Sequence, residues 1–90
     1  MTESAEHRIK RLAMRSMRRG IKEMDLILSA FADRQLRGLD AAELDLYDQL
    51  LEENDHDLYA WINGQVAVPG RYAGLIGQIA AMAVGVARSG

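Results

Sequence analysis

Residues 18–25 read Arg-Arg-Gly-Ile-Lys-Glu-Met-Asp, a polar stretch that separates two segments whose hydrophobic residues recur at helical spacing. A hydrophobic core does not require two arginines, a glycine and two carboxylates within eight residues. We therefore interpret this stretch as a junction between two helices and as the first place to look for function. The apolar positions on either side are Ile9, Leu12, Ala13 and Met17, then Met24, Ile27, Leu28 and Phe31.

The first two predicted helices flank this junction. One starts within residues 3–5 and runs to about Met17, and the other starts just after Gly20 and runs to about Leu36. Residues 37–38, an arginine and a glycine, supply a basic last turn followed by a C-cap. The second helix therefore has a well-marked end.

Two further helices are predicted from capping signals. Asp40, with Glu43 three residues later, has the pattern of a capping box, so a third helix starts there and ends at Asn54 or Asp55. Asp55 or Asp57 then caps a short fourth helix that ends at residues 63–64, Asn-Gly. The apolar positions of these helices are Leu44, Tyr47, Leu50 and Leu51 in the third and Leu58, Trp61 and Ile62 in the fourth.

Trp61 is the largest single apolar side chain of the sequence. Burial of such a ring is worth on the order of 3 kcal/mol or more, so we expect a core anchor rather than a ligand-stacking residue.

The last predicted helix covers about residues 72–86. Residues 72–87 carry no charge, but a membrane-spanning helix needs roughly 20 apolar residues, so we expect no membrane insertion. Its small residues suggest close packing through Gly74, Gly77, Ala81 and Gly85. No strand of useful length is predicted, and the expected fold is an all-α compact bundle of five short helices in a single domain, residues 1–90.

Composition bounds the class of protein. The 90 residues include no cysteine, which excludes disulfides, thiolate metal sites and a cysteine nucleophile. The first six residues contain two acids and lack the apolar run of a signal peptide, so export is not expected and a cytoplasmic location is predicted.

Catalytic apparatus is not recognisable. His7 and His56 belong to no spaced ligand cluster, none of the serines lies in a nucleophile elbow, and the glycines lack the spacing of a phosphate-binding loop. We therefore predict a non-enzyme without a metal and without a cofactor of its own.

The charges are distributed unevenly along the chain. Residues 7–22 contain seven Lys or Arg and no acid, whereas residues 40–57 contain eight acids and no Lys or Arg. Such an asymmetry either orients an approaching partner or marks two solvated helix faces. A nucleic-acid or anionic-surface binder remains the alternative function, opposed by the pI near 5.6. Its contact residues would be Arg8, Lys10, Arg11, Arg15, Arg18 and Arg19.

The junction also carries a family resemblance. Arg19-Gly20-x-x-Glu23-Met24-Asp25 resembles the Arg-Gly-x-x-Glu-Leu-Asp signature of the SdhE family of FAD assembly factors, the bacterial relatives of mitochondrial succinate dehydrogenase assembly factor 2. The likeness covers roughly residues 9–64. It continues through Phe31, Leu44, Tyr47, Leu50 and Leu51 to the element Asp55-x-Asp57-Leu58-x-x-Trp61, with Gly64 shortly after.

The resemblance implies a function that the residues alone do not reveal. Members of the family bind the flavoprotein subunit of succinate dehydrogenase, and in some bacteria that of fumarate reductase, and promote covalent attachment of FAD to it. The FAD belongs to the partner, and the assembly factor, expected to be a monomer when free, supplies no reactive group. By this likeness Arg19, Gly20 and Glu23 would lie in the partner-binding surface, with Arg18 and Asp25 beside them.

Overall fold

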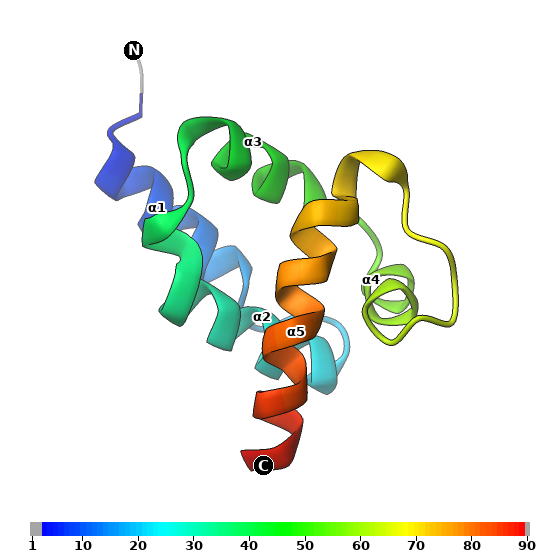
Figure 1. The fold of residues 1–90 in the computed structure, drawn as a ribbon. Coiled ribbons are helices and arrows are strands. Elements are labelled where there is room, and N and C mark those ends of the chain that lie inside the picture. The colour runs from blue at the N-terminus through cyan, green and yellow to red at the C-terminus, as the bar shows by residue number, and fades with distance from the viewer. Residues whose placement is uncertain (1–2, 90) are drawn as a thin grey trace.

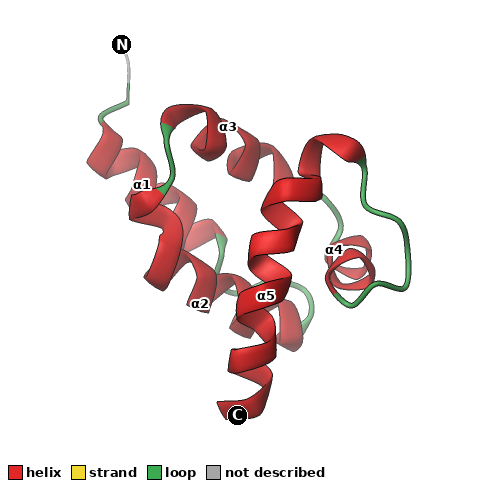
Figure 2. Ribbon diagram, viewed as in Figure 1, coloured by secondary structure: helices red, strands yellow, loops and turns green. Residues whose placement is uncertain are grey.

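The computed structural model describes residues 3–89 of the chain, with side chains as far as residue 83. Within residues 3–89 the chain forms five α-helices, two short 3-10 helices and no strand, which confirms the predicted all-α fold (Figures 1 and 2). The helices are α1 (Ala5–Arg15), α2 (Lys22–Gln35), η1 (Leu36–Gly38), α3 (Ala41–Leu50), α4 (Asp55–Ile62), η2 (Gly70–Tyr72) and α5 (Ala73–Ser89).

Helix α2 is the centre of the bundle. It contacts α1, α4 and α5, and in Figure 1 α5 crosses in front of it while α4 lies to the side of α5. A long loop, green in Figure 2, leads from α4 round the outside of the molecule to α5. The start of α2, where the polar junction enters, is thus held by the helices on several sides.

The core follows the apolar stripes expected from the sequence. Burial of one large apolar side chain contributes roughly 1.5–3 kcal/mol, and such burial is the main stabilisation of short helices in a protein. Fully buried side chains come from α1, α2, η1, α3, α4, η2 and α5: Leu12, Met24, Leu28, Phe31, Leu36, Tyr47, Leu50, Leu58, Tyr72 and Ile79.

Met17 does not join this core, although its spacing predicted that it would. Helix α1 ends at Arg15, so Met17 lies in the turn beyond it and its side chain is 49% exposed. The helical period no longer determines which way a residue points once the helix has ended.

Capping residues start the helices largely as expected. Asp40 and Glu43 form the predicted capping box, with Glu43 N–H donating to Asp40 Oδ1 at 2.8 Å and Asp40 N–H to Glu43 Oε1 at 3.0 Å. Helix α4 differs from the prediction, because its N-cap is Asn54, whose Oδ1 accepts from His56 N–H at 2.8 Å. The carboxylate of Asp55 is consequently available for another contact.

Helix α5 packs through its large residues. Leu75, Ile76 and Ile79 are buried, whereas Gly74 and Gly77 are exposed, and a Cβ built on either would meet no atom within 4 Å. Close packing through the small residues was therefore a wrong prediction for these two glycines and for the exposed Ala81. Gly85 and Val86 lie beyond residue 83, the last whose surroundings are described.

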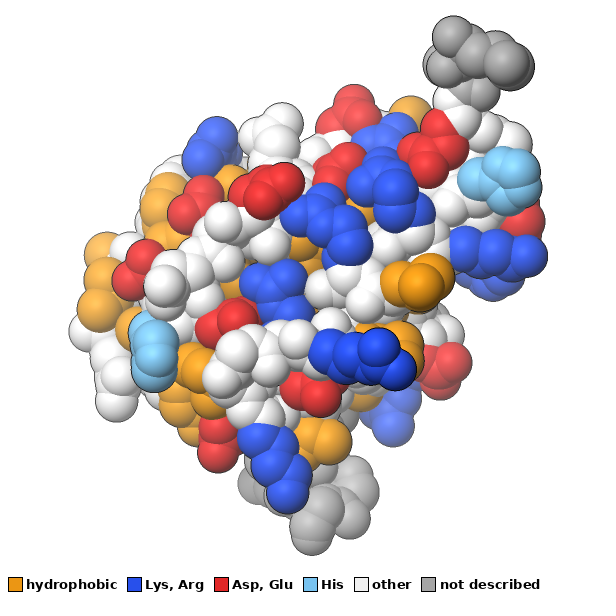
Figure 3. All heavy atoms as spheres, turned by 180° about the vertical axis from the view of Figure 1, so that it is seen from behind, with side chains coloured by type: hydrophobic (Ala, Val, Ile, Leu, Met, Phe, Trp, Pro, Cys, Tyr) orange, Lys and Arg blue, Asp and Glu red, His pale blue; other side chains and the backbone are white. Residues whose placement is uncertain are grey.

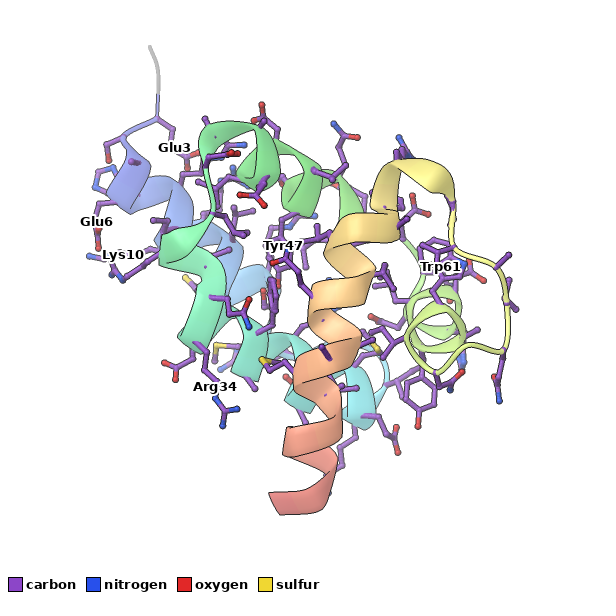
Figure 4. All side chains as sticks on the ribbon, viewed as in Figure 1. Glu3, Glu6, Lys10, Arg34, Tyr47 and Trp61 are labelled. Atoms are coloured by element: carbon purple, nitrogen blue, oxygen red, sulfur yellow. The ribbon has the colours of Figure 1, made fainter. Side chains whose placement is uncertain are left out.

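Trp61, near the end of α4, is partly buried and packs against the core (Figure 4). Its ring lies 5.8 Å from that of the buried Tyr72, centroid to centroid. The Tyr72 hydroxyl donates to Glu53 Oε2 at 2.9 Å. These contacts tie the start of α5 to the connection between α3 and α4.

Candidate functional site

The junction begins with a turn whose backbone is strained at Arg18. This residue has a φ of 56°, in the left-handed region that costs a residue with a Cβ roughly 1–2 kcal/mol. Its N–H donates to Asp25 Oδ1 at 2.8 Å, which offsets part of that cost. The Arg18 side chain is exposed, and no residue that the structure describes accepts a hydrogen bond from its guanidinium.

Arg19 points in the opposite direction, into the bundle, where its side chain is only 12% exposed. Its Nε donates to Asp55 Oδ1 at 2.8 Å. The terminal nitrogens donate to the carbonyl oxygens of Arg15 at 3.2 Å, Leu51 at 3.1 Å and Glu53 at 3.4 Å. Arg19 thus binds carbonyl groups at the ends of α1 and α3, which helix geometry leaves without partners.

Gly20 is held by the same carboxylate. Its N–H donates to Asp55 Oδ2 at 2.8 Å, and a Cβ at this position would lie only 3.1 Å from that oxygen. The residue with positive φ in this turn is Arg18 and not Gly20. A glycine is favoured here because the backbone approaches Asp55 closely.

Glu23 and Asp25 have different environments although both lie in the first turn of α2. Asp25 Oδ1 accepts from Arg18 N–H and also from Ser29 Oγ at 3.3 Å. Glu23 is exposed, and its carboxylate accepts no hydrogen bond from any residue between 3 and 89. Of these two carboxylates, it is Asp25 that binds the backbone of the turn.

The structure thus divides the five predicted partner-binding residues into two groups. Arg19, Asp25 and the N–H of Gly20 are engaged within the protein, whereas the side chains of Arg18 and Glu23 face solvent. The inward group orients the turn, and the outward group presents one charge of each sign.

Two residues that support the junction, Asp55 and Ser16, were not predicted to do so. Asp55 was expected to be a helix cap, and its place in the Asp-x-Asp-Leu-x-x-Trp element was the available signal. Ser16 is fully buried at the C-cap of α1, where its carbonyl accepts from Ser29 Oγ at 3.3 Å and its hydroxyl lies 2.6 Å from the Tyr47 hydroxyl. Figure 4 shows Tyr47 in the middle of the bundle. Burial raises the pKa of Tyr47 to about 12.

Most of the basic charge of α1 is neutralised by α3. Arg8 pairs with Asp45, Arg11 donates to Asp48 at 3.1 Å, and Arg15 contacts both Asp48 and Glu52. The hydrogen bond from Arg11 lowers the pKa of the Asp48 carboxyl. Basic and acidic side chains accordingly alternate across the rear face in Figure 3 instead of forming one basic patch.

These ion pairs bear on the alternative function. Of its six proposed contact residues, Arg8, Arg11, Arg15 and Arg19 are each paired with a carboxylate of α3 or α4. Neutralised cations release fewer counterions from a nucleic acid and contribute less to its binding. The geometry gives the nucleic-acid alternative no support.

A shallow pocket of about 400 Å³ lies on α3 and the turn after it. It is lined by Asp45, Asp48, Gln49 and Glu52, and its three carboxylates are the ones that pair with Arg8, Arg11 and Arg15. Over the part of the chain that is described, no group of His, Cys, Asp and Glu side chains has the arrangement of a metal site. None of the helices described combines the length and the apolar character that a membrane crossing requires.

Comparison with known proteins identifies relatives. A family model described as "Flavinator of succinate dehydrogenase" matches residues 10–83. A mitochondrial succinate dehydrogenase assembly factor 2 of Mycosarcoma maydis is 42% identical over 72 residues, which are 80% of this chain and 30% of the relative. Its namesakes in Debaryomyces hansenii and Meyerozyma guilliermondii are 51% and 49% identical over 59 residues, 66% of this chain and 42% and 44% of theirs. The matched segment thus spans less than half the length of these relatives.

The relatives correct one prediction. Each of the three is named as a mitochondrial protein, so the cytoplasmic location expected from the sequence was wrong, and their names point to mitochondria. The expectation rested on the missing apolar run of a secretory signal, a feature that bears on export and does not distinguish the cytoplasm from an organelle.

Proposed function

The chain belongs to the family described as flavinator of succinate dehydrogenase, and on this basis we propose that it binds the flavoprotein subunit of that enzyme and promotes covalent attachment of FAD to the subunit. The family match is the observation that carries the proposal. The exposed, rigidly supported junction between α1 and α2 supplies a surface suited to it.

The proposed contact surface is centred on Gly20 and Glu23. Glu23 offers a carboxylate with no partner among the described residues, and the neighbouring Arg18 offers a planar donor fork. Met14 and Met17, which precede Arg18 in the sequence and are 73% and 49% exposed, add flexible apolar area at the end of α1. An interface needs such a combination of apolar contact with a few oriented charges.

Arg19 and Asp25 act in this proposal by holding the junction in shape. Their side chains are committed to Asp55, to helix-end carbonyl groups and to the Arg18 backbone. A surface that is rigid before binding loses less conformational entropy when the partner arrives.

The role is that of a non-catalytic assembly factor, with the FAD bound by the flavoprotein. Support comes from the family name, which describes a flavinator of succinate dehydrogenase. The chain would then act on the conformation of its partner, as a monomer, and the reacting groups would belong to the flavoprotein.

The experiment uses purified apo-flavoprotein subunit, FAD and the full chain, with covalent flavin measured by fluorescence after denaturing electrophoresis. We expect the chain to accelerate flavinylation and Glu23→Ala to abolish most of that acceleration. Asp33→Ala is the matched control, because it also removes an exposed carboxylate from α2. Equal activity of the wild-type chain and Glu23→Ala would remove Glu23 from the site, and no acceleration by the wild type would refute the function.

The same proteins can be used to test whether fumarate reductase is a second target and whether the free chain is a monomer. The flavoprotein subunit of fumarate reductase replaces that of succinate dehydrogenase in a parallel assay, and acceleration there would extend the proposal to both enzymes. Sedimentation equilibrium of the free chain tests the monomer, since a mass near 20 kDa, twice the 10.0 kDa of one chain, would contradict it.

A further inference from the structure

Asp55 is far from the junction in sequence, yet both of its carboxylate oxygens bind there. Oδ1 accepts from Arg19 Nε and Oδ2 from the N–H of Gly20, each at 2.8 Å. The side chain is 16% exposed, so this ion pair is largely shielded from water. A charged hydrogen bond in such surroundings is stronger than one on the surface.

The carboxylate of Asp55 is not needed to start its own helix. Asn54 caps α4 by accepting from His56 N–H at 2.8 Å. Asp55 is the first residue of α4 and its side chain turns back to the α1–α2 turn. Its conformation is therefore explained by the junction that it holds.

This contact holds the backbone immediately before α2. Gly20 immediately precedes Ile21, the N-cap of α2, and Ile21 makes no capping hydrogen bond with its side chain. The backbone just before α2 is instead fixed from outside, by Asp55 through the Gly20 N–H. Glu23 follows three residues after Gly20, in the first turn of α2.

We propose that Asp55 is the positioning residue of the partner-binding junction: by binding Arg19 and the Gly20 backbone together it holds Glu23 in the arrangement that the flavoprotein recognises. This inference rests on the proposed function and deepens it. Asp55 acts through Gly20 and Glu23 and does not itself contact the partner.

The test compares Asp55→Asn with Asp57→Asn in the full chain. Asparagine is nearly isosteric with aspartate but has an NH2 group in place of one oxygen, so one of the two donors, Arg19 Nε–H or Gly20 N–H, would face another donor. Asp57 is exposed in the same first turn of α4, and its replacement makes the same change of charge near the helix N-terminus. Binding to the flavoprotein subunit is measured by calorimetry, and the Gly20 amide by ¹⁵N-resolved NMR and hydrogen exchange.

We expect Asp55→Asn to keep its helical circular dichroism, to exchange the Gly20 amide faster and to bind the partner about tenfold more weakly. Asp57→Asn should match the wild type in all three measurements. Binding by folded Asp55→Asn equal to the wild type, or an equal loss in both variants, would overturn the inference. If the wild-type chain itself does not bind or flavinylate the partner, the proposed function is what has failed.

Asp55→Glu provides a second test should the asparagine variant fold poorly. It keeps the negative charge but carries the carboxylate one methylene farther from the backbone. A residue that acted only through its charge would leave partner binding unchanged, which would contradict positioning. The inference predicts weaker binding per folded molecule together with a displaced Gly20 amide resonance.

Discussion

The hydroxyl oxygen of Tyr47 lies 2.6 Å from Oγ of Ser16, and both side chains are fully buried. Ser16 Oγ donates its hydrogen to the carbonyl of Leu12 at 2.8 Å, so Tyr47 is the donor in the contact between the two hydroxyls. This short hydrogen-bond chain fixes the end of α1 against α3 and so supports the turn that follows. These hydrogen bonds are polar contacts within an otherwise apolar core.

Replacement of either hydroxyl should destabilise the fold by unequal amounts. Tyr47→Phe keeps the ring, whose centroid is 5.5 Å from that of Phe31, and should lower the free energy of unfolding by about 1 kcal/mol. Ser16→Ala leaves the buried Tyr47 hydroxyl without an acceptor and should cost about 2 kcal/mol. Urea unfolding followed by circular dichroism measures both, and a larger loss for Tyr47→Phe would contradict this assignment of donor and acceptor.

The buried phenol also predicts a loss of stability in alkali. Burial raises the pKa of Tyr47 to about 12, above the ordinary value of 10.0, so the unfolded chain loses this proton first. The contribution of Tyr47 to stability is complete below pH 10 and decreases as the pH rises from about 10 to about 12. Unfolding free energies measured across this range should fall more steeply for the wild type than for Tyr47→Phe, and parallel curves would show that another group is responsible.

Local signals in the sequence predicted the local structure. Asp40 and Glu43 are three residues apart, and their capping box forms as the pattern indicated. The contacts of Asp55 with Arg19 and Gly20 could not be predicted in the same way, because 36 and 35 positions separate them and no periodicity links such positions. Asp55 and Asn54 are both good capping residues, and the fold decided between them.

For the candidate site, too, contacts between residues distant in the sequence could not be predicted. The sequence identified the junction itself, and the division of its side chains into inward and outward groups depends on where α3 and α4 pack. The inward direction of Arg19 follows from the carbonyl groups that the end of α3 places beside it. The partner-binding role of these residues stays a prediction.

The ion pairs between α1 and α3 predict that stability depends on salt and on acid. Asp48→Asn removes the carboxylate that Arg11 and Arg15 share and should lower the free energy of unfolding by about 1 kcal/mol at low salt, and by less at 1 M salt. The pKa of Asp48 lies below its ordinary value of 3.8, so its stabilisation is present above that pH and is lost as the pH falls further. Urea titrations at pH 7 and pH 3 measure this, and an equal effect of Asp48→Asn at both pH values would exclude the ion pair as its cause.

Because Gly20 lies close to Asp55, we expect alanine to destabilise the protein more at Gly20 than at Gly38. Gly20→Ala places a Cβ 3.1 Å from Asp55 Oδ2, which must shift, and should cost about 1 kcal/mol of stability. Gly38→Ala is the matched control, because a Cβ there meets no atom within 4 Å, and it should be neutral or stabilise by up to about 1 kcal/mol. Thermal unfolding distinguishes the two. Equal melting temperatures would mean that the Asp55 carboxylate moves without cost.

Arg19 belongs to the inward group of the junction and Glu23 to the outward group. We therefore expect replacement of Arg19 to lower the stability of the fold and replacement of Glu23 to leave it nearly unchanged. Lysine cannot reproduce the planar fork by which Arg19 reaches Asp55 and the carbonyl groups, so Arg19→Lys should lose about 2 kcal/mol of stability although it keeps the charge. The exposed Glu23 makes no hydrogen bond to a described residue, and Glu23→Ala should therefore change stability by less than about 0.5 kcal/mol.

In the flavinylation assay we expect both variants to lose activity, Glu23→Ala with an unchanged melting temperature and Arg19→Lys together with a lowered one. In the proposed function Glu23 would contact the partner, whereas Arg19 would shape the surface on which Glu23 lies. A double-mutant cycle of Arg19→Lys with Asp55→Asn measures the support directly, because residues in one hydrogen-bonded pair couple by about 0.5–3 kcal/mol. A stable but inactive Arg19→Lys would instead place the Arg19 guanidinium in the interface, and the inward geometry of the free chain would then have to change on binding.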